Sequence, residues 1–448
     1  MTLLIRDATV VTMDAAGTIY APGAVLVDGV RIADVGPSEE VARRAPSGCE
    51  VMEAHGRIAL PGFVSAHNHL GYTVFRGRAE DVGHSPTHRL YLPMSMVMHR
   101  DEREALGSLA VAELLRGGVT TVLEMEEDAD VLAPFIARAG IRAAIGLMTH
   151  DVDLDRLMAG ETVFDARVRR DQVERAIGFA QDWHGAAGER ISAIITANGL
   201  STSSPELLRA LRAAADRLGL RLSIHLASGE MHLVRGIHGQ DSFEYAAANG
   251  FLGEDVIAVH CYRIDEPGID AIAESGTHLA HCPLMNQFRG GIAPVGAMRA
   301  RGVNVGLGID NYFSDFFDVI RSCIAVARIR ADDPEVMQAP DALALATVGS
   351  ARAMGLDDRI GSIELGKRAD LQLVDMRRFG LVPVTDPIRT LVYHAHAKDV
   401  ETVMVDGQVL VRDGMLVDLD EGDLIERAAW AAKAAWGRFH ERFGAYVT

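Results

Sequence analysis

The sequence has little cysteine and no cluster of basic residues. Only four of its 448 residues are cysteines, and their spacing fits neither a zinc finger nor a disulfide framework: Cys49, Cys261, Cys282 and Cys323. We therefore expect a reduced protein of the cytoplasm. The formal net charge is −18. This argues against a nucleic-acid or anionic-membrane partner, because such partners are bound by basic side chains that neutralise phosphates.

Long apolar runs are also lacking, so no segment is predicted to span a bilayer. The first residues, MTLLIRDATVVTMD, have neither the charged head nor the long apolar core of a signal peptide. Apolar residues nevertheless make up 48% of the chain, enough for a sizeable core. The length exceeds that of a usual single core and predicts one large barrel with an appended domain, or two or three domains.

Four segments differ in their patterns. Residues 1–56 alternate as short strands between Gly and Asp turns, and residues 366–420 return to this β pattern. Residues 57–365 repeat an apolar strand, a polar loop and a helix rich in Ala, Leu and Arg. Residues 421–448 form an amphipathic helix that is expected to pack on its own chain or on a neighbour. We predict an α/β fold, a (β/α)8 TIM-like barrel with a small β-sandwich domain built from both terminal segments.

The predicted barrel strands follow one another along residues 57–365. They are ALPGFVSA, VTTVLE, IRAAIGLM, ISAIITA, LRLSIH, DVIAVHC, THLAHC and VNVGLGID. In such a barrel, catalytic groups lie at the carboxyl ends of the strands, where the loops to the helices gather.

Histidines and one aspartate occupy these strand ends. His67 and His69 end the first strand, His225 the fifth, His260 the sixth and Asp310 the eighth. Residues two apart in a strand point the same way, so His67 and His69 can bind one cation together. Three histidines and one carboxylate are the ligand set of a catalytic divalent metal, with a position left for water.

Each of these residues also has an ordinary structural explanation. A single His-X-His pair is often a surface coincidence, and a histidine that ends a strand is commonly a buried residue bonded to a loop carbonyl. An aspartate after VGLGI can cap the next helix. Only the combination of the three histidines and the carboxylate, His67, His69, His225 and Asp310, favours a metal site.

Several motifs resemble the amidohydrolase superfamily, in particular the branch of cytosine, guanine and adenosylhomocysteine-type deaminases and triazine hydrolases. The matching stretches are PGFVSAHNH, HLAS, HCYRID, HLAHCPLMN and GLGIDN, followed by ATVGSARAMGLDDRIGSIELGKRADLQLVD, the most specific one, and DVETVMVDGQVLV. The resemblance covers nearly the whole chain.

The resemblance implies roles for the residues at the strand ends. His67, His69, His225 and Asp310 correspond to the metal ligands, and His260 to the histidine that faces substrate and water. The fourth strand, ISAIITANG, ends without the lysine that relatives with two metals carry. One divalent ion per chain follows, either zinc or iron.

The resemblance fails at one important position. The deaminases have a glutamate three residues after the histidine of the fifth strand, and it protonates the ring nitrogen while water attacks. Here Ser228 stands at that position, and a serine hydroxyl cannot act as an acid near neutral pH. Glu230 follows two residues later and is a candidate for this role, although a solvated loop carboxylate is at least as common.

Three further residues are candidates for substrate contact. His281 and Asn286 of HCPLMN are expected to shape the seventh loop. Met94 lies in YLPMSMVMH, where the family keeps substrate-contacting residues, so it is a candidate for an apolar pocket wall. The alternation of methionines in that stretch fits core packing equally well.

The sequence thus predicts a metal-dependent hydrolase of carbon–nitrogen bonds other than peptide bonds, acting through an activated water on a small cyclic or heterocyclic substrate. In this prediction Asp310 takes the proton of the water and passes it to the leaving nitrogen, and His260 stabilises the developing oxyanion. The alternatives are a deaminase of a purine, pyrimidine, pterin or triazine and, in a different class, a metal-free binding or assembly protein. A homo-oligomer is expected.

Overall fold

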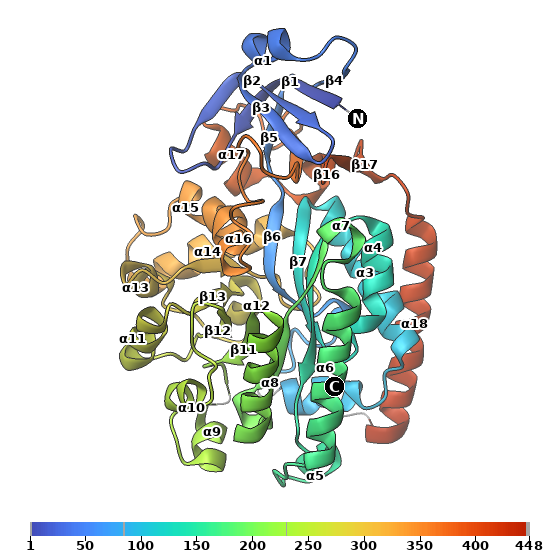
Figure 1. Ribbon diagram of the computed structural model, residues 1–448, viewed down its shortest axis with the longest axis vertical. Coiled ribbons are helices and arrows are strands. Elements are labelled where there is room, and N and C mark those ends of the chain that lie inside the picture. Colours follow the sequence, from blue (N-terminus) through green and yellow to red (C-terminus); the bar gives the residue numbers. More distant parts are fainter. Residues whose placement is uncertain (1, 84–85, 230, 445–448) are drawn as a thin grey trace.

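The computed structural model describes residues 2–83, 86–229 and 231–444. It contains two sheets, and one of them is a parallel barrel of eight strands in series with helices outside it (Figure 1). The barrel follows the strand order β6-β7-β8-β10-β11-β12-β13-β14, with β9 beside β8. Its strands are β6 (Phe63–Asn68), β7 (Val119–Glu126), β8 (Arg142–Thr149), β9 (Ile191–Ala193), β10 (Ile195–Gly199), β11 (Leu222–Leu226), β12 (Val256–His260), β13 (His278–His281) and β14 (Val305–Leu307).

Backbone hydrogen bonds between the first and last strands close the barrel. The amide of Asp310 donates to the carbonyl of His67 at 3.1 Å, and the amide of His69 donates to the carbonyl of Asp310 at 2.7 Å. The closure therefore brings the ends of β6 and β14 together, and with them three of the residues that the sequence proposed as ligands.

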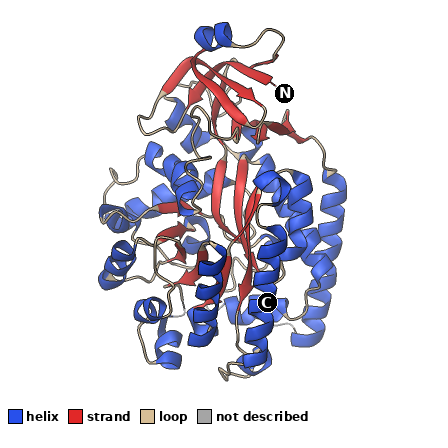
Figure 2. Cartoon of the chain, viewed as in Figure 1, coloured by secondary structure: helices blue, strands red, loops and turns tan. Residues whose placement is uncertain are grey.

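Helices surround the barrel and follow its strands in turn (Figure 2). They are α2 (Leu92–Ser95), α3 (Arg100–Arg116), α4 (Ala133–Ala139), α5 (Leu154–Met158), α6 (Ala166–Trp183), α7 (Ala186–Glu189), α8 (Pro205–Leu218), α9 (Met231–His238), α10 (Ser242–Ala248), α11 (Glu266–Ser275), α12 (Pro283–Phe288), α13 (Val295–Ala300), α14 (Phe316–Ala331), α15 (Ala339–Ala344) and α16 (Ser350–Ala353). Short helical turns are η1 (Leu70–Phe75), η2 (Thr87–Tyr91), η3 (Ala129–Leu132), η4 (Leu200–Thr202), η5 (Leu345–Gly349) and η6 (Ala397–Asp399).

The second sheet combines strands from both ends of the chain. Its order is β18-β17-β16-β15-β5-β1-β2-β3, with β4 beside β1. The strands are β1 (Thr2–Val11), β2 (Ile19–Asp28), β3 (Arg31–Pro37), β4 (Glu50–Glu53), β5 (Arg57–Pro61), β15 (Leu371–Asp375), β16 (Val400–Val405), β17 (Gln408–Arg412) and β18 (Met415–Leu416); α1 (Ser38–Arg44) and α17 (Pro387–His394) accompany them. The predicted fold class is confirmed, and the domain limits at residues 56, 365 and 420 stay predictions.

Two predicted barrel strands are interrupted. ALPGFVSA divides at Gly62, so that β5 joins the second sheet and β6 joins the barrel. A side chain at Gly62 has no room, because its Cβ would lie 2.1 Å from the Thr120 side chain. The fourth barrel strand divides at Ile194 into β9 and β10, whose alternation of apolar residues continues across the break and conceals it.

The second sheet lies against the amino ends of the barrel strands, away from the carboxyl ends where the histidines lie. Arg142, the first residue of β8, forms buried ion pairs with Asp370 at 2.8 Å and with Asp406 at 2.6 Å. These pairs join the barrel to the second sheet on the side opposite the candidate site.

The C-terminal helix α18 (Glu421–Phe443) lies along α3 (Figure 1). The indole of Trp436 donates to the carbonyl of Val74 at 2.9 Å, and Arg438 donates to the carbonyl of Val97 at 2.9 Å. The helix thus fastens the segment between β6 and α3. Among the described residues, no helix is long and apolar enough to cross a membrane.

Candidate metal centre

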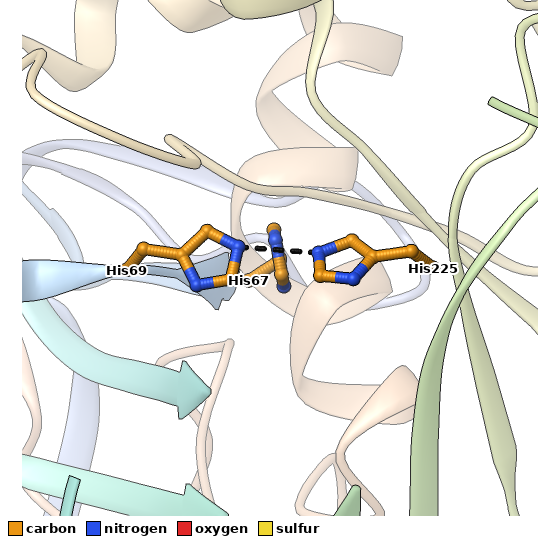
Figure 3. Close-up of side chains that lie close together, drawn as sticks. All are labelled: His67, His69 and His225. Carbon is orange, nitrogen blue, oxygen red and sulfur yellow. Dashed lines mark hydrogen bonds between the residues drawn. The ribbon is translucent and has the colours of Figure 1, made fainter. Parts of the chain in front are cut away.

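Five side chains from four strand ends meet inside the mouth of the barrel. The Nε2 atoms of His69 and His225 lie 3.1 Å apart. An oxygen of the Asp310 carboxylate lies 3.8 Å from Nε2 of His67 and 3.9 Å from Nε2 of His69, and its other oxygen lies 3.9 Å from Nδ1 of His260. Figure 3 shows the rings of His67, His69 and His225 converging on one point. The structure therefore brings together all the residues that the sequence proposed as ligands.

The hydrogen bonds of His69 and His225 determine which ring nitrogens carry hydrogen. Nδ1 of His69 lies against the carbonyl of Met125, and Nδ1 of His225 against the carbonyl of Asn198. A carbonyl only accepts, so each Nδ1 is the protonated nitrogen of a neutral ring. Both Nε2 atoms are then bare lone pairs that face each other at 3.1 Å. This arrangement is repulsive by itself and suits two ligands of one cation, each about 2.0–2.1 Å from it.

Other buried polar atoms at this point have no partner among the described residues. They are both ring nitrogens of His67, Nδ1 of His260 and Oδ2 of Asp310. Buried polar atoms are otherwise nearly always hydrogen-bonded in folded proteins. Together with the facing Nε2 atoms, these orphaned atoms form a nitrogen and oxygen donor set that fits a divalent metal ion.

Burial adjusts the charges of the donor set. It lowers the pKa of His67, His69 and His260 well below the usual value and that of His225 to about 4. The rings are therefore neutral at pH 7, the form in which imidazole binds metal. Burial raises the pKa of Asp310 to about 6, against the opposing effect of the Arg289 cation.

Unusual backbone conformations aim two of these side chains. His260 has a φ of 75° and Asp310 a φ of 73°, in the left-handed region that residues with a Cβ rarely adopt. Each turns the chain sharply where its strand ends, so that the side chain points over the barrel mouth. Such strain persists only where the surrounding structure holds it, and it clusters at functional sites.

Gly308 is a residue packed closely against the centre that sequence reasoning missed. A Cβ at this position would lie 3.0 Å from both Cβ and the carbonyl oxygen of His67, and 3.1 Å from Sγ of Cys282. A side chain here would therefore require these neighbours to shift by a few tenths of an ångström. Gly308 is the second glycine of VGLGID, and a glycine inside a strand pattern is a known sign of a close approach. Its contact with the first strand is not visible in the sequence.

Two buried glutamates at the end of β7 hold the backbone that follows His69. Glu124 accepts from the amide of Leu70 at 3.0 Å, and Glu126 accepts from the amide of Gly71 at 2.8 Å and pairs with Arg103. Burial raises the pKa of both carboxyls. The predicted strand VTTVLE already ends with one of these residues, although nothing in its pattern assigns them a role.

The remaining predicted residues lie at different distances from this centre. Ser228 is half-buried, just beyond β11, and Glu230 lies outside the described residues. His281 and Asn286 are buried, and none of their side-chain nitrogens and oxygens has a partner in the described part of the chain. Met94 is fully buried in an apolar cluster with Tyr72 and Tyr91. The roles assigned to these residues stay predictions.

Comparison with known proteins agrees with the fold. The model of the amidohydrolase family matches residues 58–410, which is most of the chain and includes every strand of the barrel. The chain belongs to the amidohydrolase family. As expected, it is an enzyme that hydrolyses carbon–nitrogen bonds other than peptide bonds, and its substrate is a small molecule.

Relatives of this amidohydrolase cover nearly its whole length. It is 34% identical over 440 residues to a 5-methylthioadenosine/S-adenosylhomocysteine deaminase of Moorella thermoacetica, with 94% of this chain and 97% of the relative aligned. It is 31% identical to a 5'-deoxyadenosine deaminase of Methanosarcina mazei, with 96% and 98% aligned.

The fold of a solved structure is also similar. An adenosine deaminase from Xanthomonas campestris, described with bound zinc, matches with a TM-score of 0.89 and 28% sequence identity over 97% of this chain and 98% of that one. The atrazine chlorohydrolase TrzN from Arthrobacter aurescens has a TM-score of 0.87 over 96% of this chain and the whole of that one, but 22% identity, so this likeness concerns the fold alone.

Proposed function

We propose that this amidohydrolase is an aminohydrolase that uses one divalent metal ion to release ammonia from an amino-substituted heterocycle. His67, His69, His225 and Asp310 are the proposed ligands. The observation that carries the proposal is the pair of bare Nε2 atoms of His69 and His225, which face each other at 3.1 Å. Zinc is the proposed ion because a relative of similar fold is described with bound zinc, and iron is its competitor.

In the proposed reaction Asp310 is the proton carrier. A divalent cation held by these ligands lowers the pKa of a water molecule toward neutrality and polarises the carbon that the water attacks. The two oxygens of Asp310 differ: Oδ1 faces His67 and His69, whereas Oδ2 has no hydrogen-bond partner among the described residues. Oδ2 is therefore placed to take the proton of the attacking water and to return it to the leaving amino group.

His260 stands beside that oxygen and supports the same step. Its Nδ1 lies 3.9 Å from Oδ2 of Asp310 and has no partner in the described structure. A ring N–H at this position would donate to the oxygen of the attacking water as that oxygen bonds to the substrate carbon. A donor of this kind contributes about 3 kcal/mol in a site that excludes water.

The proposal also includes what the comparisons leave open. We propose that the enzyme is cytoplasmic and forms a homo-oligomer. The chemical class proposed for the substrate rests on the names of the relatives, which are deaminases of adenine nucleosides and related compounds.

Ammonia release by the zinc-loaded enzyme tests this function. The panel contains adenosine-type nucleosides, cytosine, aminopterins and aminotriazines, with zinc content measured on the same samples. We expect one equivalent of ammonia for each oxo product, and no release by the His225→Ala variant. Bound zinc without ammonia from any of these compounds would refute the deaminase proposal.

Ser228 favours a second function, the hydrolysis of a cyclic amide or urea. Protonation of a ring nitrogen needs an acid above the metal, and the side chain three residues after His225 is a hydroxyl. An amide or urea bond needs only the proton that Asp310 already carries. Hydrolysis of a panel of cyclic amides and ureas, with no ammonia from the amino-heterocycles, would support this function.

Two substitutions locate the acid. We expect Ser228→Ala to reduce the catalytic constant by less than about tenfold, the effect of one neutral hydrogen bond. Glu230→Gln distinguishes the two functions. Loss of turnover with zinc retained would assign the acid of a deaminase to Glu230, whereas near-normal rates in both variants would leave Asp310 as the proton carrier.

A further inference from the structure

Arg289 is a cation at the edge of the metal centre that the proposed reaction does not use. It follows α12, and its Nη2 atom donates to the hydroxyl of Tyr91 at 2.7 Å. In the amide orientation that satisfies both of its polar atoms, Asn311 accepts from the same Nη2 at 3.1 Å and donates to Oδ1 of Asp310 at 2.7 Å. One amide group therefore separates the guanidinium from a proposed metal ligand.

This arginine has no carboxylate partner among the described residues. Arg103 and Arg142, two other arginines in the interior, pair with Glu126 and with Asp370 and Asp406. No Asp or Glu oxygen of the described chain lies within 4.0 Å of the Arg289 guanidinium. A partly buried cation that has no carboxylate in direct contact is costly unless a ligand supplies one.

The unused side of the guanidinium is open to a ligand. Nη2 contacts Tyr91 and Asn311, while Nε and Nη1 have no hydrogen bond to the described residues and are not enclosed as buried atoms without partners. The hydroxyl of Tyr91 and the amide of Asn311 fix the orientation of the group. Through the amide of Asn311 the guanidinium is linked to Oδ1 of Asp310. It therefore acts on the same space as the metal ligands.

We propose that Arg289 binds a carboxylate of the substrate that is attached to the heterocycle itself. The inference rests on the proposed function and specifies its substrate class. A divalent ion and Arg289 together outweigh the single negative charge of Asp310, so the pocket attracts an anion. Because one amide, that of Asn311, bridges Arg289 and Asp310, the anionic group lies near the attacked carbon and not on a long substituent.

Matched ligand pairs test this inference without knowledge of the substrate. Binding of orotate and uracil, pyrazinoate and pyrazinamide, and pterin-6-carboxylate and pterin is measured by calorimetry on zinc-loaded protein. We expect at least one carboxylate to bind more tightly than its neutral partner. In Arg289→Met that preference should fall by roughly 10- to 100-fold, the value of a lost charged hydrogen bond, while affinity for the neutral partner changes less than about threefold.

Three further variants keep the result interpretable. Arg289→Lys retains the charge and should keep part of the preference. Tyr91→Phe removes one of the two groups that orient Arg289 and should weaken the preference less than Arg289→Met. Arg263→Met removes an exposed arginine that follows β12, and the preference should stay unchanged. Zinc content and melting temperature are measured for each variant.

The outcomes separate this inference from the proposed function. No carboxylate preference in any pair, or an equal loss for charged and neutral ligands in Arg289→Met, would overturn the role of Arg289 even if ammonia is released. Absence of ammonia release from the heterocycle panel would refute the deaminase, while the binding preference would still identify the anion site.

Discussion

Individual residues in this centre differ in what they contribute, and the structure separates two kinds of histidine. His67 lies among the proposed ligands, and neither of its ring nitrogens has a hydrogen-bond partner in the described chain. His260 faces Oδ2 of Asp310. In the proposed function the first kind holds the ion, and the second acts on the reacting groups. Removal of one or the other should therefore have different effects.

We expect His67→Ala to lose bound zinc and activity together while the barrel remains folded. His260→Ala should retain most of the zinc and lose roughly 100-fold in the catalytic constant, the effect of one lost oxyanion donor. Zinc analysis, circular dichroism and steady-state rates check both variants. Full zinc and full activity in His67→Ala would remove His67 from the site.

His281 provides a test of burial through the pH dependence of stability. Burial lowers its pKa to about 3, below the usual value near 6.5. Below pH 6.5 the His281 ring of the unfolded chain therefore binds a proton, whereas the ring of the folded protein stays neutral. The free energy of unfolding falls as the pH decreases from 6.5 toward 3. Between pH 6.5 and 5 this costs about 2 kcal/mol.

The variant His281→Gln lacks this contribution. Thermal melting of the metal-free protein at pH 7.5 and pH 5 should show a smaller decrease in midpoint for the variant than for the unmodified chain. Equal decreases would mean that the His281 ring is accessible to protons in the folded state.

At the scale of elements, the site depends on how closely β14 approaches β6. Gly308 permits this approach, and hydrogen bonds between His67, His69 and Asp310 close the barrel there. The Ser65 hydroxyl accepts from the amide of Ile309 at 3.1 Å, which adds a side-chain bond to the same seam. The register of these two strands therefore determines the relative positions of three proposed ligands.

We expect Gly308→Ala to weaken zinc binding by about tenfold or more, the usual cost of displacing the support of a ligand. The new Cβ would lie 3.0 Å from the Cβ and from the carbonyl oxygen of His67, so His67 would have to move. Gly178→Ala in α6 is the matched control because no atom lies within 4 Å of its added Cβ. Zinc titration against a competing chelator measures both. Equal zinc affinities in the two variants would show that β14 and β6 can separate enough to accept a side chain at residue 308.

In the molecule as a whole, the second sheet and the catalytic mouth lie at opposite ends of the barrel. Arg142 connects the two parts through Asp370 and Asp406, with side chains less than a tenth exposed. Loss of Arg142 takes the ion-pair partner of Asp370 away and leaves Asp406 with Arg368 at 3.5 Å, so its effect falls on stability. The proposed ligands are attached to other strand ends and should be undisturbed.

Arg142→Met should accordingly lower the free energy of unfolding by about 3 kcal/mol or more and leave zinc affinity unchanged in the folded protein. The control is Arg156→Met, which removes an exposed pair with Glu161 and should cost less than about 1 kcal/mol. Melting temperature and zinc titration distinguish the two effects. A loss of zinc affinity in folded Arg142→Met would show that the junction acts on the metal centre.

The sequence by itself determined the barrel and the proposed ligands, because each rests on local order. Apolar strands alternate with helices, and the histidines and Asp310 end strands whose carboxyl ends must meet at one mouth. The offset of two residues between His67 and His69 needed no tertiary information, since it follows from the strand repeat.

Other features depend on contacts between distant segments, and only the tertiary structure decided them. The division of ALPGFVSA at Gly62 depends on Thr120, and the close packing at Gly308 depends on His67. Arg289 acquires a role only because folding brings it beside Tyr91 and Asn311 without a carboxylate partner in the described chain. Local patterns carry the periodicity of each element, whereas the space and charge around a residue are set by segments far away in the sequence.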